Sequence, residues 1–368
     1  MTYLALRNLF QQKFRLTLSI AGVALSMMLI ILLNGFLSGI YLQVTAYLDN
    51  TPADWVVAQD GVTNLLSGTS ILPSNAEDQA RGVPGLASVT PIISQFIILD
   101  IHEEKVVAYL VGYDPDLGGG PWRIGEGHAP RKESEVVVDR IMAQKHGFAL
   151  GDKIEILDKE FTIVGLSEGT NSWMASFIFI QKRAAEDLFL IPNTASFLLL
   201  TLKPGADPQT VKARLDSRLH EMEIVPKETM KQNDLKLLVK IFAVPLRLMV
   251  AIAFAVGTAI LGMIIYTATV EREREYGVLK AVGVKNFQLY WLVTQQGLMI
   301  AFLGVLLGIG LAQVAATWIM DITPKFLIVL ENTEVLKISL VGLLMGLGAA
   351  LTPTRQVARL DPAQVFRK

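Results

Sequence analysis

Cysteine is absent from the 368-residue chain. Its absence excludes structural disulfides, cysteine-based zinc sites and catalysis by a thiol. The formal net charge is only −1 at pH 7, so the strongly basic balance typical of nucleic-acid-binding proteins is missing as well. A chain without cysteine is compatible with an oxidising exterior but does not require one. We expect no nucleic-acid partner and no cysteine chemistry.

Motifs for catalysis and for phosphate binding are also missing. No Gly-x-x-x-x-Gly-Lys-Ser/Thr loop occurs, which predicts that the chain does not bind ATP itself. The run Gly118-Gly119-Gly120 is followed by Pro121 rather than by a lysine, and is typical of a loop. The four histidines are not spaced as a metal-ligand pair, and no serine lies in a nucleophile elbow. We therefore expect neither an enzyme nor a metal or cofactor held by this chain.

What the sequence does contain is four stretches without a charged residue. They comprise residues 16–48, 248–270, 286–320 and 338–354. A helix needs about 20 apolar residues to cross the hydrocarbon core, so the first three are long enough and the fourth fits a short or tilted span. None shows the polar face of a soluble helix. The sequence predicts a multi-pass α-helical membrane protein with four transmembrane helices, the first of them a permanent anchor.

Basic residues are concentrated on one side of these spans. The loop between the third and fourth spans has only Lys325 and Lys337. The other flanks hold eleven basic residues: Arg7, Lys13, Arg15, Arg272, Arg274, Lys280, Lys285, Arg355, Arg359, Arg367 and Lys368. By the positive-inside rule these eleven face the cytoplasm, so both termini are expected there. The long segment between the first two spans is then expected outside.

This long segment has the pattern of an α+β domain. Residues 92–101 and 105–113 are rich in β-branched residues and are joined by the polar His102-Glu103-Glu104, which predicts a hairpin. Residues 154–157 and 161–164 predict a second hairpin that turns at Asp158-Lys159. Strands and helices occur without regular alternation, which favours α+β over α/β.

Two helix starts are recognisable in the same segment. Ser74-Asn75-Ala76-Glu77 matches a capping box and predicts a helix that begins there. Asp207-Pro208 predicts another, with aspartate as the cap and proline at the first helical position. In that second helix Val211, Leu215 and Leu219 would share one face.

The segments that flank the first two spans have helical patterns. Residues 1–15 place aromatic and basic side chains on different faces, which favours an interfacial helix over a plain extension of the first span. Residues 231–246 predict a helix continuous with the second span and bent near Pro245. Arg247 lies at the outer edge of that span. It is interpreted either as a residue that snorkels to the headgroups or as a contact for an anionic substrate or an interface.

The most informative motif directly follows the second span. Residues 271–283 read Glu-Arg-Glu-Arg-Glu-Tyr-Gly-Val-Leu-Lys-Ala-Val-Gly. Charges of opposite sign lie three residues apart, Glu271 with Arg274 and Arg272 with Glu275, which supports a short helix. Gly283 is well placed to end it. From the residues alone, a solvated loop that only fixes topology is an equal alternative.

This motif resembles the segment after the second span in MacB/FtsX-type ABC transporter permeases. Five further phrases resemble that family in the same order, so the resemblance covers nearly the whole chain: Ala5-Leu-Arg-Asn-Leu-Phe, Gly112-Tyr-Asp-Pro, Leu150-Gly-Asp-Lys-Ile, Phe161-Thr-Ile-Val-Gly, and the tail from Pro353 to Arg367 with its Leu-Asp-Pro. Tyr276 departs from the aliphatic residue that is usual there, without threatening the assignment.

The resemblance implies a permease subunit in a bacterial cell (inner) membrane. Two copies would pair as a homodimer in lipid, each would dock a separate ABC ATPase subunit, and ATP and Mg²⁺ would bind to that partner. ATP hydrolysis would drive export or extraction of a substrate by mechanotransmission, with an adaptor protein or outer-membrane channel as a further partner. The alternatives are a regulator of the same fold that activates extracytoplasmic cell-wall hydrolases, and a receptor or scaffold without an ATPase.

Residues 271–285 would be the coupling helix, with contacts to the ATPase from Glu271, Arg272, Arg274, Glu275, Gly277, Val278, Leu279, Lys280 and Val282.

Glycines four residues apart in the last two spans predict close helix packing. Gly304 and Gly308 form one such pair, and Gly342 and Gly346 form the other. Packing within one subunit and packing at a dimer seam are both open. Asn34, Gly35 and Ser38 would serve similarly in the first span.

The resulting domain plan has nine parts. They are an amphipathic interfacial helix (1–15), transmembrane helix 1 (16–41), an extracytoplasmic α+β domain with stalk (42–240), transmembrane helix 2 (247–270), the coupling helix (271–285), transmembrane helix 3 (287–320), a short outer loop (321–335), transmembrane helix 4 (336–352) and a cytoplasmic tail (353–368).

Overall fold

The computed structural model describes residues 13–66, 68–172 and 174–358. The interfacial helix expected at residues 1–15 and the tail expected at 353–368 therefore lie largely outside the described residues. The chain divides into two compact units. One comprises the described parts of 1–38, 242–323 and 328–368, and the other comprises 39–241 and 324–327. We call the first the helical unit and the second the sheet unit.

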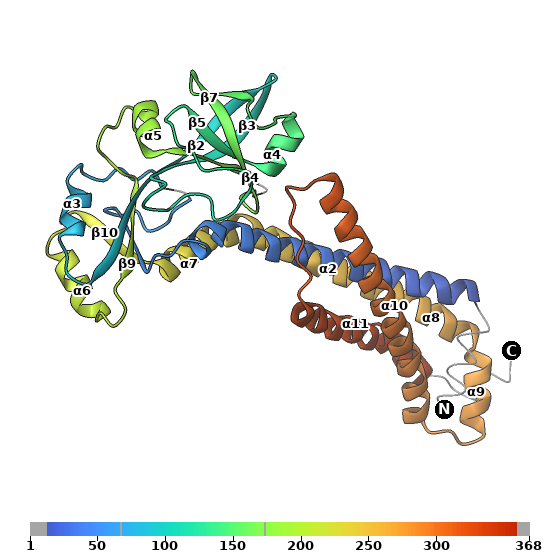
Figure 1. The fold of residues 1–368 in the computed structure, drawn as a ribbon. Helices are drawn as coiled ribbons and strands as arrows, with labels where there is room; N and C mark the ends of the chain where they lie inside the picture. The colour runs from blue at the N-terminus through green and yellow to red at the C-terminus, as the bar shows by residue number, and fades with distance from the viewer. Residues whose placement is uncertain (1–12, 67, 173, 359–368) are drawn as a thin grey trace. The chain divides into compact units, whose positions relative to one another are not determined.

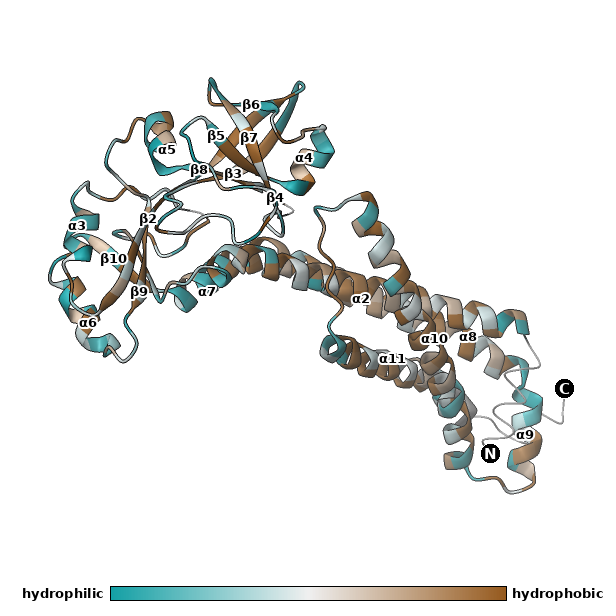
Figure 2. Ribbon diagram, viewed as in Figure 1, coloured by the Kyte–Doolittle hydropathy of each residue, from teal (hydrophilic) through white to brown (hydrophobic). Residues whose placement is uncertain are grey.

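Four helices are long and apolar enough to cross a membrane, judged by length and composition over the described residues. They are α2 (Lys13–Asp49), the continuous run Lys227–Glu271 that contains α8 (Val244–Glu271), α10 (Asn286–Ile322) and α11 (Asn332–Ala358). Hydrophobic residues dominate α2, α8, α10 and α11, whereas the short helix α9 (Glu273–Ala281) combines hydrophilic and hydrophobic residues (Figure 2). These helices agree with the multi-pass prediction.

The core of the helical unit forms where these helices face one another. Met27 of α2, Leu261 of α8 and Met345 of α11 are completely buried there. Apolar side chains on the remaining faces stay exposed, as in Met263 and Val314. Outward-facing apolar surface on all four helices is the arrangement expected when lipid is the solvent.

Each apolar helix is longer than its uncharged stretch, because backbone hydrogen bonding does not stop where hydropathy falls. The second is the clearest case. Helix α7 (Lys227–Leu238) continues through a π-helical turn (Val239–Ala243) into α8 without interruption. Pro245 lies at the start of α8, immediately after the π-helical turn. Because proline has no N–H to donate, a locally wider turn beside it is one way to keep the helix continuous.

The domain between α2 and α7, residues 50–226, is called the inter-span domain. Among the described residues it contains one ten-stranded sheet with the order β10-β1-β9-β2-β3-β8-β5-β7-β4, and β6 pairs with β7 (Figure 1). Its strands are β1 (Trp55–Gln59), β2 (Leu86–Ile101), β3 (Glu104–Tyr113), β4 (Ile124–Gly127), β5 (Glu135–Asp139), β6 (Lys153–Ile156), β7 (Lys159–Ser167), β8 (Ser176–Gln181), β9 (Phe197–Leu202) and β10 (Met222–Pro226). The pairs β3–β8 and β5–β7 are parallel and the others antiparallel, so the sheet is mixed.

Strand β2 joins the two halves of the sheet. Its first half pairs with β9 and its second half with β3, so the strand passes from one half to the other. Helices α3 (Ala76–Arg81) and α6 (Pro208–Asp216) cover one half, where Leu198, Leu200 and Leu215 are buried. Helices α4 (Arg140–His146) and α5 (Lys182–Phe189) cover the other. The α+β class predicted from the sequence is confirmed.

Both predicted hairpins are present, with one change of register. Strands β2 and β3 turn at His102 and Glu103, whose φ angles are 51° and 66°. Strands β6 and β7 turn at Leu157 and Asp158, one residue earlier than predicted, because Lys159 pairs with Ile156. A two-residue turn with positive φ at both positions matches the twist of antiparallel strands, and this requirement fixes the register.

The two predicted helix starts had different outcomes. Asp207 caps α6 as predicted, with its carboxylate accepting a hydrogen bond of 3.0 Å from the Thr210 N–H and with Pro208 at the first position. The capping box at Ser74 is wrong. Helix α3 begins at Ala76 with Asn75 at the cap position, and no side chain caps it. A box needs the serine directly at the cap, and here the helix starts one residue too late for it.

Candidate functional site

Helix α9 lies between the ends of two apolar helices. Arg272 separates it from α8, with φ of −103° and ψ of 17°, which interrupts the helical path for one residue. Gly283 follows α9 with φ of +100°, a conformation that L-residues with a side chain rarely adopt. The break at Arg272 and the glycine at 283 therefore delimit α9 as a short, separate helix.

The two faces of α9 differ in exposure. Tyr276 and Gly277 are buried, and Leu279 is half-buried against the core of the helical unit. Val278 and Val282 lie four residues apart and are 42% and 80% exposed. Residues four apart share a helix face, so these two valines make an exposed apolar surface. Of Val278, Leu279 and Val282 in the predicted contact set, Leu279 is thus the one that packs within the chain.

Charged residues surround these valines. Glu273, Arg274 and Glu275 are exposed, and the Arg272 Nη1 lies 3.6 Å from the Glu275 Oε2, as their spacing suggested. Glu271 has a partner that its spacing did not suggest. Its carboxylate receives two hydrogen bonds, of 2.6 and 2.8 Å, from the guanidinium of Arg15 at the start of α2. This bidentate pair joins the beginning of the first apolar helix to the end of the second.

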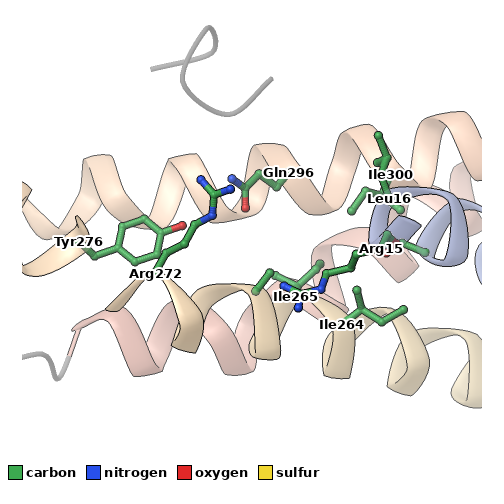
Figure 3. Close-up of a pocket in the computed structure, with 10 residues that line it drawn as sticks. Arg15, Leu16, Ile264, Ile265, Arg272, Tyr276, Gln296 and Ile300 are labelled. Carbon is green, nitrogen blue, oxygen red and sulfur yellow. Dashed lines mark hydrogen bonds between the residues drawn. The ribbon is translucent and has the colours of Figure 1, made fainter. Parts of the chain in front are cut away.

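A cavity lies beside this pair, within the helical unit. Its volume is about 40 Å³, and it lies between α2, α8, α9 and α10. Figure 3 shows Arg272 and Tyr276 near Gln296, and Arg15 reaching from α2 toward Ile265. Tyr276 and Gln296 both line this cavity, and burial raises the pKa of Tyr276. Its hydroxyl therefore remains protonated at neutral pH.

The four glycines predicted for helix packing all lie against a neighbouring helix of the same chain. A Cβ at Gly304 would be 2.6 Å from Val23 Cβ, and one at Gly308 would be 2.8 Å from Met27 Cβ, both on α2. A Cβ at Gly342 would be 2.5 Å from Val305 Cγ2, and one at Gly346 would be 2.7 Å from Ala301 Cβ, both on α10. Real Cβ atoms do not approach so closely, so each contact depends on the missing side chain.

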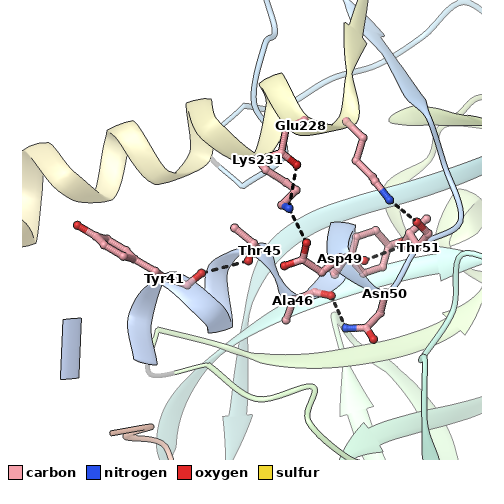
Figure 4. A network of polar contacts seen from close by, with 10 residues as sticks. Tyr41, Thr45, Ala46, Asp49, Asn50, Thr51, Glu228 and Lys231 are labelled. Atoms are coloured by element: carbon pink, nitrogen blue, oxygen red, sulfur yellow. Dashed lines mark hydrogen bonds and ion pairs between the residues drawn. The ribbon is translucent and has the colours of Figure 1, made fainter. Parts of the chain in front are cut away.

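The C-terminal end of α2 is joined to α7 within the sheet unit (Figure 4). The Lys231 Nζ lies 2.6 Å from the Asp49 Oδ1 and 3.0 Å from the Glu228 Oε2. The Lys227 Nζ donates to the Thr51 carbonyl at 3.1 Å. Tyr47 is almost completely buried and donates a 2.6 Å hydrogen bond to the Gly119 carbonyl. The end of α2 is thereby fastened both to α7 and to the inter-span domain.

Arg247, the remaining predicted residue, is exposed in the first turns of α8. It belongs neither to the lining of the cavity nor to the network around Lys231. Its role as a membrane anchor or a contact residue therefore stays a prediction.

Two family models together match most of the chain. The MacB-like periplasmic core domain matches residues 16–218, and the FtsX-like permease C-terminal model matches residues 247–362. The chain belongs to the MacB/FtsX-type family of ABC transporter permeases. The permease is thus a multi-pass membrane protein and a non-catalytic subunit of an ABC transporter, and membership implies an ATPase partner.

Individual relatives extend over the whole permease. It is 24% identical over 372 residues to an uncharacterized ABC transporter permease of Mycobacterium tuberculosis (strain H37Rv), covering 100% of this chain and 99% of the relative. It is 20% identical over 367 residues to a permease of Staphylococcus haemolyticus provisionally named for hemin transport, covering 99% and 98%. The crystal structure of the periplasmic region of MacB from Actinobacillus actinomycetemcomitans is similar at 14% identity and a TM-score of 0.40, covering 50% of this chain and 94% of that one.

Sequence reasoning missed most of the residues that line the permease's cavity, among them the polar residues Arg15, Ser19 and Gln296. Arg15 was counted only as a topology signal, although it directly precedes an uncharged run of 33 residues. Gln296 was a better clue, because a glutamine in the middle of an apolar span is costly unless it has a polar partner. Tyr276, which lines the same cavity, is the residue at which the motif departs from the usual family pattern.

Proposed function

We propose that this permease couples ATP hydrolysis in a separate ATPase subunit to export or extraction of a substrate, by transmitting movement from α9 to the inter-span domain. The observation that carries the proposal is the unbroken helical run from Lys227 to Glu271. A continuous helix transmits displacement along its axis, whereas a flexible loop absorbs it. Helix α9 is attached to one end of this run and the inter-span domain to the other.

The exposed face of α9 has the properties of a docking surface for the ATPase. Val278 and Val282 would enter an apolar groove of the partner, with the charged residues around them at the rim. Exposed ion pairs contribute only about 0–1 kcal/mol each, so these charges would set orientation and partner choice rather than affinity. The predicted contact set from Glu271 to Val282 remains the proposed coupling site. Within it, Val278 and Val282 would be the main apolar contacts, because Leu279 is half-buried within the chain.

The junction between α2 and α7 would keep the moving parts together. Lys231 and Asp49 tie the two helices at the base of the inter-span domain. Asp234 of α7 is buried and accepts backbone hydrogen bonds from Leu65 (3.3 Å) and Leu66 (3.0 Å). A push along α7 would therefore reach both the end of α2 and the loop near Leu65.

The assembly that fits this mechanism is a homodimer of the permease with two ATPase subunits, which bind the ATP and Mg²⁺. The excess of basic residues supports an orientation with both termini and α9 in the cytoplasm and the inter-span domain outside, in a bacterial cell membrane. An adaptor protein or outer-membrane channel would contact the inter-span domain where the host has an outer membrane.

Aspartate substitutions on α9 test the coupling. The full permease is purified with its ATPase and reconstituted in lipid, with Val278→Asp and Val282→Asp as variants. We expect both to insert normally, to lose the ATPase during purification and to lose permease-dependent stimulation of ATP hydrolysis. Leu190→Asp is the matched control, because Leu190 is 85% exposed in the inter-span domain. If both α9 variants retained the partner and its stimulation, α9 would be only a topology-fixing segment.

The cargo is sought with a deletion strain. Loss of the permease should sensitise cells to, or abolish release of, one class in a panel of hydrophobic compounds, peptides and haem. Complementation by Val282→Asp should fail and complementation by Leu190→Asp should succeed. A strain with unchanged export but altered cell-wall hydrolase activity would instead support the regulatory alternative.

A further inference from the structure

The cavity beside Arg15 and Glu271 has both polar and apolar lining residues. The polar ones are Arg15, Ser19, Arg272, Tyr276 and Gln296. The apolar ones are Leu16, Ile264, Ile265, Ala268 and Ile300. Such a mixed lining matches an amphipathic ligand with an anionic head rather than a soluble ion alone.

Among the residues that the structure describes, the charges that line the cavity are of one sign. Both arginines contribute to its lining, whereas their acidic partners Glu271 and Glu275 do not. A guanidinium has five N–H donors, and the bidentate pair with Glu271 uses two of those of Arg15. An anion in the cavity could therefore be bound without breaking that pair. Planar, weakly hydrated guanidinium groups are well suited to phosphate.

The cavity also lies at the depth where lipid phosphates are found. Arg15 immediately precedes the uncharged run 16–48, and Arg272 comes two residues after the uncharged run that ends at Val270. These two boundaries mark the transition from hydrocarbon to headgroup on the same side of the membrane. A phospholipid in the adjacent leaflet thus presents its phosphate at the level of both guanidinium groups.

We propose that this cavity is a binding site for an anionic phospholipid, with the headgroup phosphate between Arg15 and Arg272 and one acyl chain along Ile264 and Ile300. Tyr276 and Gln296 would add hydrogen bonds to the headgroup. Because the lining comes from α2, α8, α9 and α10, a bound lipid holds the start of α9 against three membrane helices. Lipid occupancy would in this way set how firmly α9 is attached to the bundle.

Lipid adducts of the purified full-length permease provide the test, without any ATPase. Native mass spectrometry follows retention of phosphatidylglycerol and of phosphatidylcholine with identical acyl chains. We expect the wild type to retain phosphatidylglycerol at lower concentration than phosphatidylcholine. Arg272→Gln should raise the phosphatidylglycerol concentration needed by about tenfold, since a charge-assisted contact is lost. Arg274→Gln, which removes an exposed charge of the same helix, should leave it unchanged.

Photolabelling and competition distinguish a lipid in the cavity from nonspecific lipid contact and from a bound inorganic anion. A phosphatidylglycerol analogue with a photoreactive group near the head should label peptides of the wild type that contain residues 264–276 or 296–300. This experiment uses the wild type alone and does not depend on the folding of any variant. Labelling confined to exposed positions such as Met263 and Trp318 would overturn the proposal. So would equal retention of the two lipids, equal effects of Arg272→Gln and Arg274→Gln, or displacement of the lipid by an equimolar amount of inorganic phosphate.

Discussion

Arg15 and Glu271 are 256 positions apart in the sequence, yet they form a bidentate ion pair with contacts of 2.6 and 2.8 Å. Arg15 lies in the first turn of α2, and Glu271 is the last residue of α8. The pair therefore fixes the relative height of two membrane helices at the end where α9 begins. Two parallel hydrogen bonds between a guanidinium and a carboxylate fix the relative orientation of the two groups and are stronger than hydrogen bonds between neutral groups.

Exchanging the two charges should preserve this relationship. Arg15→Glu and Glu271→Arg alone should each destabilise the permease by about 0–1 kcal/mol, because the side chains are 26% and 45% exposed and water screens the pair. The double exchange should recover most of the loss. Thermal unfolding in detergent at low and high salt measures this cycle. A double variant less stable than either single variant would show that the pair is incidental.

Gly39 of α2 should tolerate no side chain. A Cβ at this position would lie 1.7 Å from the carbonyl oxygen of Leu327, and backbone cannot move aside as a flexible side chain can. Gly39→Ala should therefore cost about 1–3 kcal/mol, the range of overpacked sites. Gly310→Ala is the matched control, since no atom of the residues described by the structure lies within 4 Å of its Cβ position. The unfolding temperature of Gly39→Ala should fall below that of Gly310→Ala. Equal temperatures would mean that Leu327 does not pack against Gly39.

The inter-span domain should respond to pH through Asp139. This carboxylate caps α4, accepts hydrogen bonds from the Ile141 and Met142 N–H groups and the Thr170 hydroxyl, and is 1% exposed. Burial raises the pKa of Asp139, an effect that these hydrogen bonds oppose. The folded state thus binds the proton more tightly than the unfolded state. The contribution of Asp139 to stability should fall as pH rises from the ordinary aspartate pKa of about 4 through the folded pKa.

Asp139→Asn and Asp207→Asn should show opposite pH trends. Asparagine keeps an acceptor for the N–H groups of α4. The stability of Asp139→Asn relative to the wild type should therefore increase as pH rises. Hydrogen bonds from Thr210 lower the pKa of Asp207. The stability of Asp207→Asn relative to the wild type should therefore decrease as pH rises. The measurement is the unfolding temperature of the full-length chain in detergent across the acid range. Parallel trends for the two variants would contradict the assignment.

Local features of the fold were predictable from the sequence, and long-range pairing was not. The β2–β3 hairpin follows from alternating apolar residues around a polar turn, and the cap at Asp207 follows from two adjacent residues. Nothing local indicates that β3 lies parallel to β8 or that β2 divides its pairing between β3 and β9. Such contacts depend on which strands the chain brings together over tens of residues.

The same distinction between local features and long-range contacts applies to the candidate site. Its helix, its valines and the Arg272–Glu275 pair follow from spacing within one segment. The partner of Glu271 could not be read from spacing, because Arg15 comes from another helix and local pairing with Arg274 was equally reasonable. Leu279 and Val282 looked alike in the sequence, and only packing shows that Leu279 is half-buried while Val282 is 80% exposed.

The orientation of the permease should be decided by a reporter placed after Asp152, in the turn before β6. The excess of basic residues on the other side predicts that this position lies outside the cytoplasm. Alkaline phosphatase fused there should be active and a fluorescent protein that matures only in the cytoplasm should be dark. Fusions at Lys285 should give the reverse result. Cytoplasmic fluorescence from the Asp152 fusion would reject the orientation and, with it, docking of α9 to a cytoplasmic ATPase.

The junction of Asp49 with Lys231 should be needed for coupling but not for assembly. Lys231→Met removes the cation that lies 2.6 Å from Asp49 and keeps most of the apolar length of the side chain. The variant should insert, bind its ATPase through α9 and hydrolyse ATP, because none of these steps involves the inter-span domain. Export should fall, since α7 could then slide past the end of α2 instead of moving it.

Lys212→Met is the matched control: Lys212 forms a comparable 3.0 Å pair with Asp216 on α6, away from both helices. The exchanged pair Asp49→Lys with Lys231→Asp should restore export if attraction between the helices is what matters. Normal export by Lys231→Met, with the ATPase bound, would mean that movement reaches the inter-span domain through α7 alone.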